Sequence, residues 1–403
     1  MIIVVLSVGH KNIRRETLQS TGRTFDKNCT AVMKGMLIIF MLYHHLFSGD
    51  YTLHGVKLVF APDVFNYPYF VLFGKTCVGG FAFLSAYGMM KQMMNLRGAK
   101  EFLKAVAKRL IKLESTVIFI YLVAMLYITL VLRVPIASFY TDANGFFHKH
   151  WIIIDALGLA ELFRTGTFNI TWWYMSAAVL IILVMPVVCV IYRSLAKLSK
   201  SESAGRRFAG MQRYLILIFM LIYPFLLMEN ERYMNHLIVL LAAVFFGAAF
   251  AYEGWLEKLD DYRRSSSFTQ IVYIAVCAAV LVICFRIGMK YVNIDRVYAP
   301  TAVVFAMLTI SYLSKIPYLK GALAFLGKYS GDIFMIHTLI YYYYYPDFIY
   351  SFRYDIVILL VLLGCSLGVS ILIGLLRKVT RYDKLVGKVT ARIDLICDRR
   401  EMH

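Results

Sequence analysis

The sequence predicts an all-α, polytopic membrane protein with about ten transmembrane helices and both termini in the cytoplasm. Of its 403 residues, 60% are hydrophobic and only 17% are charged, whereas soluble domains are roughly half apolar and a quarter charged. Apolar stretches close to the length that a helix needs to cross a bilayer recur along the chain. Finally, Lys and Arg residues are concentrated in every second segment between these stretches.

Three of the apolar stretches contain no charge and meet the length requirement fully: residues 115–132, 169–192 and 356–376. Seven more are shorter or contain charges such as Lys34 and Asp332: residues 31–49, 68–90, 214–229, 236–253, 269–288, 297–313 and 322–345. With the N-terminus inside, most of the 43 Lys and Arg residues fall on the cytoplasmic side, as the positive-inside rule requires. We therefore expect ten spans in the plasma membrane.

These spans divide the chain into a basic N-terminal segment (1–29), a membrane domain (30–377) and a basic C-terminal tail (378–403), with both ends cytoplasmic. A net charge of +19 would suggest nucleic acid as the partner of a soluble protein. Here the positive-inside rule accounts for it, and we expect membrane lipid and no nucleic acid as a partner. The seven cysteines lack CxxC spacing and lie mostly in apolar runs, so we expect neither a disulfide framework nor a metal site.

The first predicted span carries two ionisable residues, which are costly inside a membrane and therefore indicate function. Lys34 and His45 are eleven residues apart, so on a helix they share one face and lie about 16 Å apart along its axis. His44 points about 100° away. A cation near the cytoplasmic end and a neutral base deeper on the same face suit a long substrate with an anionic end, such as a coenzyme A thioester. Alternatively, Lys34 snorkels to the interface and His45 is a structural histidine.

Four further motifs follow in order along the chain. They are GGFAFLSAYGMMK (79–91), KRLIKLEST (108–116), WWYM (172–175) and LGKYSGDIFMIH (326–337). Together with the Lys34–His45 pair, their order and spacing resemble the membrane acyltransferase-3 family, bacterial multi-pass enzymes that O-acylate glycans and other acceptors outside the cytoplasm. The sequence departs from the family's pattern at Ala86, where Gly is expected, and at Phe334, where Tyr is common.

The resemblance implies transfer of an acyl group, most commonly acetyl, from cytoplasmic acyl-CoA to a hydroxyl of a cell-envelope or exported glycan. The acceptor is then the glycan itself or a lipid-linked glycan, and the location is the bacterial inner membrane. His45 would be the catalytic residue, either as general base on the hydroxyl or as a transient acyl carrier. Candidate residues for binding the donor are Lys34, Arg109, Lys112, Ser85 and Tyr87, and for binding the acceptor Asp50, Trp173 and His337.

Most of these candidates also have a structural explanation. Basic residues at the start of the third span anchor helices to anionic lipid. Small residues around Ser85 allow close helix packing. Trp173 would mark the membrane interface, and His337 would be a hydrogen-bonded core histidine.

Two other functions compete with acyl transfer. One is a transporter or flippase of lipid-linked sugars, although the two similar halves of many transporters are not evident. The other is a glycosyltransferase that uses a polyprenyl-phosphate sugar. It would favour acidic residues after the first span, where Asp50 and Asp63 stand without a recognisable pairing. The oligomeric state and the identities of acyl group and acceptor stay open.

Overall fold

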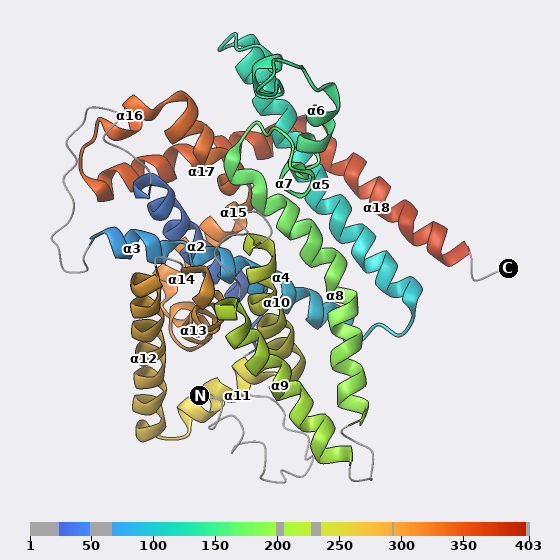
Figure 1. Ribbon diagram of the computed structural model, residues 1–403, viewed down its shortest axis with the longest axis vertical. Helices are drawn as coiled ribbons and strands as arrows, with labels where there is room; N and C mark the ends of the chain where they lie inside the picture. Colours follow the sequence, from blue (N-terminus) through green and yellow to red (C-terminus); the bar gives the residue numbers. More distant parts are fainter. Residues whose placement is uncertain (1–23, 49–66, 199–204, 227–234, 292–293, 400–403) are drawn as a thin grey trace.

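The structure, a computed structural model, describes residues 24–48, 67–198, 205–226, 235–291 and 294–399 (Figure 1). Within these ranges the chain is a bundle of helices, and its only β-pairing is a single bridge between Thr141 and Phe147. The predicted all-α class is therefore confirmed.

Most of the longer helices follow the apolar stretches in order. The longer helices are α2 (Lys27–Phe47), α3 (Tyr67–Gly74), α4 (Cys77–Met93), α5 (Ala99–Leu130), α8 (Trp173–Leu198), α9 (Gly205–Leu226), α10 (Asn235–Glu253), α11 (Trp255–Arg264), α12 (Ser267–Tyr291), α13 (Tyr298–Ser311), α14 (Pro317–Lys328), α15 (Ser330–Thr338), α17 (Asp355–Val379) and α18 (Tyr382–Arg399). Of these, α11 and α18 are more polar and lie outside the apolar stretches. Shorter helices α6 (Lys149–Ala156) and α7 (Ala160–Phe163) lie between α5 and α8, and α16 (Pro346–Tyr350) precedes α17.

Among the described residues, seven helices are long and apolar enough to cross a membrane. The number is eight if α10 and α11, which are bent by 66°, form one span. The protein is thus a multi-pass membrane protein, whereas the total of ten spans and the cytoplasmic side of the termini stay predictions. The described apolar part of α9, Tyr214–Phe225, is shorter than a full span.

The stretch 322–345 is not one continuous helix, which corrects the sequence-based expectation. It is divided into α14, α15 and a π-helix (Leu339–Tyr344). The first interruption is at Tyr329, whose backbone angles, φ −97° and ψ 6°, depart from helical values. Lys328 and Asp332 flank this point, and Asp332 pairs with Arg377 of α17 at 2.6 Å. The embedded charges of this stretch therefore lie where the helix is broken.

Helix α2 lies at the centre of the bundle and contacts α3, α4, α13, α14, α15 and α17. Its buried face includes Leu37, Ile38, Met41 and Leu42, each at most 1% exposed. Its contact with α14 is very close, because a Cβ atom added at Gly35 of α2 would overlap the backbone carbonyl of Leu323. The two helices are held together where small residues let their backbones meet.

The same close contact predicts that Gly327→Val destabilises the folded protein. A Cβ atom at Gly327 of α14 would overlap the backbone carbonyl of Ala31, so the two backbones must separate. We expect a destabilisation of about 1–3 kcal/mol or more, the usual cost of overpacking a core. The measurement is the thermal unfolding midpoint and the monodisperse yield of detergent-purified protein. Gly321→Val is the matched control in the same helix, because nothing lies within 4 Å of its added Cβ. Equal stability of the two variants would contradict the close packing.

Candidate active site

Helix α2 carries the Lys34–His45 pair predicted from the sequence. Its first turn is capped by Asp26, whose Oδ1 accepts a hydrogen bond of 2.8 Å from the N–H of Cys29. The helix then continues without a break to Phe47. An unbroken helix keeps Lys34 and His45 on one face, and both line the same cavity.

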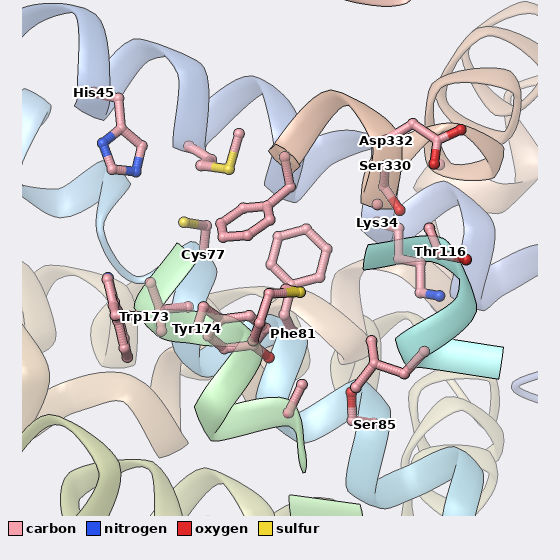
Figure 2. Close-up of a pocket in the computed structure, with 18 of the residues that line it drawn as sticks. Lys34, His45, Cys77, Phe81, Ser85, Thr116, Trp173, Tyr174, Ser330 and Asp332 are labelled. Atoms are coloured by element: carbon pink, nitrogen blue, oxygen red, sulfur yellow. The ribbon is translucent and has the colours of Figure 1, made fainter. Parts of the chain in front are cut away.

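This cavity, here called the histidine cavity, has a volume of about 460 Å³ and is lined mainly by α2, α4, α5, α8 and α15. Figure 2 shows His45 and Trp173 at one end and Lys34, Ser85, Thr116 and Asp332 at the other. Phe81 and Tyr174 lie between the two ends. The cavity is therefore an elongated space with a histidine at one end and a lysine at the other.

A second cavity, the cationic cavity, has a volume of about 910 Å³ and lies towards the start of α2. The cations that line it are Lys27, Lys34, Lys91, Arg109, Lys112 and Lys328. Four residues line both cavities: Lys34, Ser85, Gly327 and Lys328. The two cavities therefore adjoin at Lys34, and together they lead from a positively charged space to His45.

His45 is half-buried and lies among other aromatic rings. Its ring centroid is 5.3 Å from that of His44 and 5.1 Å from that of His337. Within the described part of the chain the structure shows no hydrogen bond to the His45 ring. Its nitrogens are thus open to a group that enters the cavity.

His337 lies behind His45 and does not line the histidine cavity. It is 0% exposed, and its Nδ1–H donates to the carbonyl oxygen of Phe334 at 2.8 Å. Its Nε2 lies 3.1 Å from Thr338 Oγ1. Because both ring nitrogens already have protein partners, this geometry favours the structural explanation, in which His337 supports the His45 ring by packing.

His44 and Lys75, to which the sequence assigned no role in the site, also line the histidine cavity. His44 does so although it is turned away from His45 on the helix, and its Nδ1–H donates to the carbonyl oxygen of Val71 at 2.9 Å. Lys75 lies between α3 and α4, and its Nζ is 2.9 Å from Asp295 Oδ1. The charge of Lys75 inside an apolar run was a visible signal, but its position beside the cavity follows from the break between the two helices.

The predicted donor-binding residues gather around the cationic cavity. Arg109 and Lys112, from α5, line it, as do Ser85 and Tyr87 from α4. The hydroxyl of Tyr87 donates to Glu257 Oε1 at 3.2 Å, so Tyr87 also helps to fix α11 against α4. The sequence-based grouping of these four residues is compatible with this arrangement, and their roles stay predictions.

Of the predicted acceptor-binding residues, only Trp173 is placed at the histidine cavity by the described structure. Trp173, the first residue of α8, lines the histidine cavity at the same end as His45 but across from it (Figure 2). Asp50 lies outside the described residues.

Arg377 was not identified from the sequence, yet it lines the cavity together with its partner Asp332. Across the described ranges, no cluster of three His, Cys, Asp or Glu side chains is arranged to hold a metal ion.

Residues 31–375 match a protein family described as Acyltransferase domain. No curated protein and no solved structure matches the chain. The matched range includes both α2, with Lys34 and His45, and nearly all of α17. Because this range covers most of the sequence, the chain belongs to the membrane acyltransferase-3 family, and it is a multi-pass membrane acyltransferase.

Proposed function

We propose that the protein moves an acyl group, most commonly acetyl, from cytoplasmic acyl-CoA to a hydroxyl of a cell-envelope or exported glycan. The acceptor is a free or lipid-linked glycan on the opposite side of the bacterial inner membrane. The observation that carries this proposal is the junction of the two cavities at Lys34, which connects a cationic space with His45.

The cationic cavity suits the charged part of the donor. Phosphates are recognised by Lys and Arg side chains through charge-assisted hydrogen bonds, and Arg109, Lys112 and Lys34 are three such groups on its wall. The pantetheine arm is thin and uncharged, so it fits the junction beside Ser85. The thioester at its tip then extends through the histidine cavity towards His45, which lies about 16 Å further along α2 than Lys34.

At the far end, His45 acts as the general base. Its unprotonated ring nitrogen takes the proton of the acceptor hydroxyl while the hydroxyl oxygen attacks the thioester carbonyl carbon. The C–S bond breaks, the thiolate of CoA leaves, and the imidazolium returns the proton to it. Trp173 lines the same end of the histidine cavity as His45, where it can contact the acceptor (Figure 2).

The competing route makes His45 a covalent carrier. The ring nitrogen would attack the carbonyl carbon, CoA would leave as the thiolate, and the acceptor hydroxyl would then take the acyl group. Incubation with radiolabelled acetyl-CoA and no acceptor separates the routes. Label covalently bound at His45 supports the carrier route, whereas unlabelled protein that turns over when acceptor is added supports the base.

The route through the junction predicts that Ser85→Trp stops acyl transfer without preventing donor binding. Ser85 lines both cavities, so an indole at this position fills the passage between them. We expect transfer to fall by about a hundredfold or more, since the thioester no longer reaches His45. CoA affinity should change far less, because the other cations of the cationic cavity are untouched.

The measurements are acetyl transfer to cell-envelope glycan in membranes and equilibrium binding of CoA to purified protein. Ser85→Ala, which keeps the passage open, is the matched control and should retain most of the activity. Full activity of the Ser85→Trp variant would show that the donor does not use this passage.

A further inference from the structure

Helix α18 lies beyond residues 31–375, the range matched to the family. The sequence suggested only a basic tail there, yet α18 runs beside α5 and contacts it (Figure 1). At its start, the Tyr382 ring packs against Phe119 with centroids 4.7 Å apart, and its hydroxyl donates to the carbonyl oxygen of Ser115 at 2.9 Å. The first turn of α18 is therefore fixed to α5.

A second attachment lies three turns further along α18. Asp394 Oδ1 is 2.8 Å from the Nζ of Lys104 and 2.6 Å from the Nζ of Lys108, both on α5. Hydrogen bonds from Lys104 and Lys108 hold the pKa of the Asp394 carboxyl below its ordinary value. Two attachments, at Tyr382 and Asp394, keep the intervening part of α18 against α5.

Between these attachments the helices enclose a cavity of about 440 Å³. From α18 it is lined by Gly387, Thr390, Ala391 and Asp394, which follow the i, i+3, i+4, i+7 spacing of one helix face. From α5 it is lined by Ala105, Lys108, Arg109 and Lys112. The wall is thus cationic on one side and made largely of small residues on the other.

This α5–α18 cavity adjoins the cationic cavity, because Gln92, Arg109 and Lys112 line both. A CoA donor bound in the cationic cavity could therefore extend into the α5–α18 cavity. Beyond its diphosphate, CoA ends in an adenosine whose ribose carries a 3′-phosphate. The cations of α5 outnumber the single carboxylate of Asp394 there, so the cavity favours an anion, and its small residues leave room for a flat base.

We propose that the α5–α18 cavity binds the 3′-phosphoadenosine end of the CoA donor, so that α18 completes the donor site. Lys108 pairs with the 3′-phosphate, and the adenine lies over Gly387 and Ala391. The proposal rests on the proposed function, since it takes acyl-CoA as the donor.

The test compares equilibrium binding of CoA, 3′-dephospho-CoA and 4′-phosphopantetheine to full-length protein purified in lipid nanodiscs. Wild type should bind CoA about tenfold more tightly than 3′-dephospho-CoA, the effect of about one charge-assisted hydrogen bond. Lys108→Gln should remove this preference and leave the affinity for 3′-dephospho-CoA unchanged.

A second variant tests the space over α18. Nothing lies within 4 Å of a Cβ atom added at Gly387, and leucine favours a helix more than glycine does, so Gly387→Leu should fold. The variant should bind CoA and 3′-dephospho-CoA about tenfold or more less tightly than wild type, and its affinity for 4′-phosphopantetheine should not change. Val389→Leu, on another face of α18 and 43% exposed, is the matched control that should change nothing.

Equal binding of CoA and 3′-dephospho-CoA by wild type would overturn the subsite and leave the proposed function standing. A CoA preference as strong as that of wild type in Lys108→Gln, together with wild-type CoA affinity in Gly387→Leu, would also overturn it. If wild type bound none of the three compounds, the proposed CoA donor itself would be contradicted.

Discussion

Replacing His45 with alanine is expected to lower acyl transfer by about a thousandfold, within the range that a positioned general base contributes. The protein should stay folded, because the described structure shows no hydrogen bond to the His45 ring whose loss would leave a buried group unpaired. The loss should appear in kcat, and donor affinity should stay near the wild-type value, since the ring is far from the cationic cavity. The measurement is acetyl transfer at saturating acetyl-CoA, with CoA binding measured in parallel.

His44→Ala is the matched control for this prediction. His44 is the neighbouring residue and lines the same cavity, but its ring donates a hydrogen bond to Val71. We expect its loss to reduce the rate by less than about tenfold, with some loss of stability from the missing hydrogen bond. If His45→Ala kept more than a tenth of the wild-type rate, or if His44→Ala were the more damaging change, the assignment of the base to His45 would be wrong.

Replacing Lys34 with alanine should weaken binding of the acyl-CoA donor and leave the rate of the chemical step nearly unchanged. Lys34 lies where the two cavities meet, so we expect it to contact the donor between its diphosphate and its thioester. Loss of one charge-assisted hydrogen bond, about 1.5–3 kcal/mol, corresponds to an increase in the KM for acetyl-CoA of about 10- to 150-fold. The measurement is a donor titration, in which kcat should change by less than about threefold.

Lys34→Arg keeps the charge and should restore much of the donor affinity. Lys27→Ala provides a matched loss of charge at the exposed rim of the cationic cavity. There solvent weakens the interaction, and the KM should rise by less than about fivefold. A fall in kcat with an unchanged KM in Lys34→Ala would instead place Lys34 in the chemical step.

Most of the helices were predictable from the sequence because a helix that crosses a bilayer must be long and apolar. The pairing of Lys34 with His45 was predictable for a similar reason, as both lie on one unbroken helix with a fixed rise and rotation per residue. The division of residues 322–345 was not predictable, since their mean composition still resembles a single apolar stretch.

The remaining parts of the site depend on contacts between distant segments. Arg377 reaches the histidine cavity because α17 packs against α15, and Lys75 does so because the chain breaks between α3 and α4. Neither arrangement follows from local periodicity. His337 could be recognised within its motif, but only the three-dimensional structure shows that its ring nitrogens are already occupied by Phe334 and Thr338.

The most direct test of the central claim uses sealed vesicles prepared from the cells that make this protein. In the proposed reaction, a donor on the cytoplasmic side reaches His45, and its acyl group is transferred to a glycan on the other side. Radiolabelled acetyl-CoA, which does not cross membranes, is added outside inverted vesicles, with their cytoplasmic face exposed, and outside right-side-out vesicles. We expect labelled glycan in inverted vesicles with wild-type protein, and none in right-side-out vesicles or with His45→Ala. Equal labelling in both orientations, or undiminished labelling with His45→Ala, would contradict the proposed reaction.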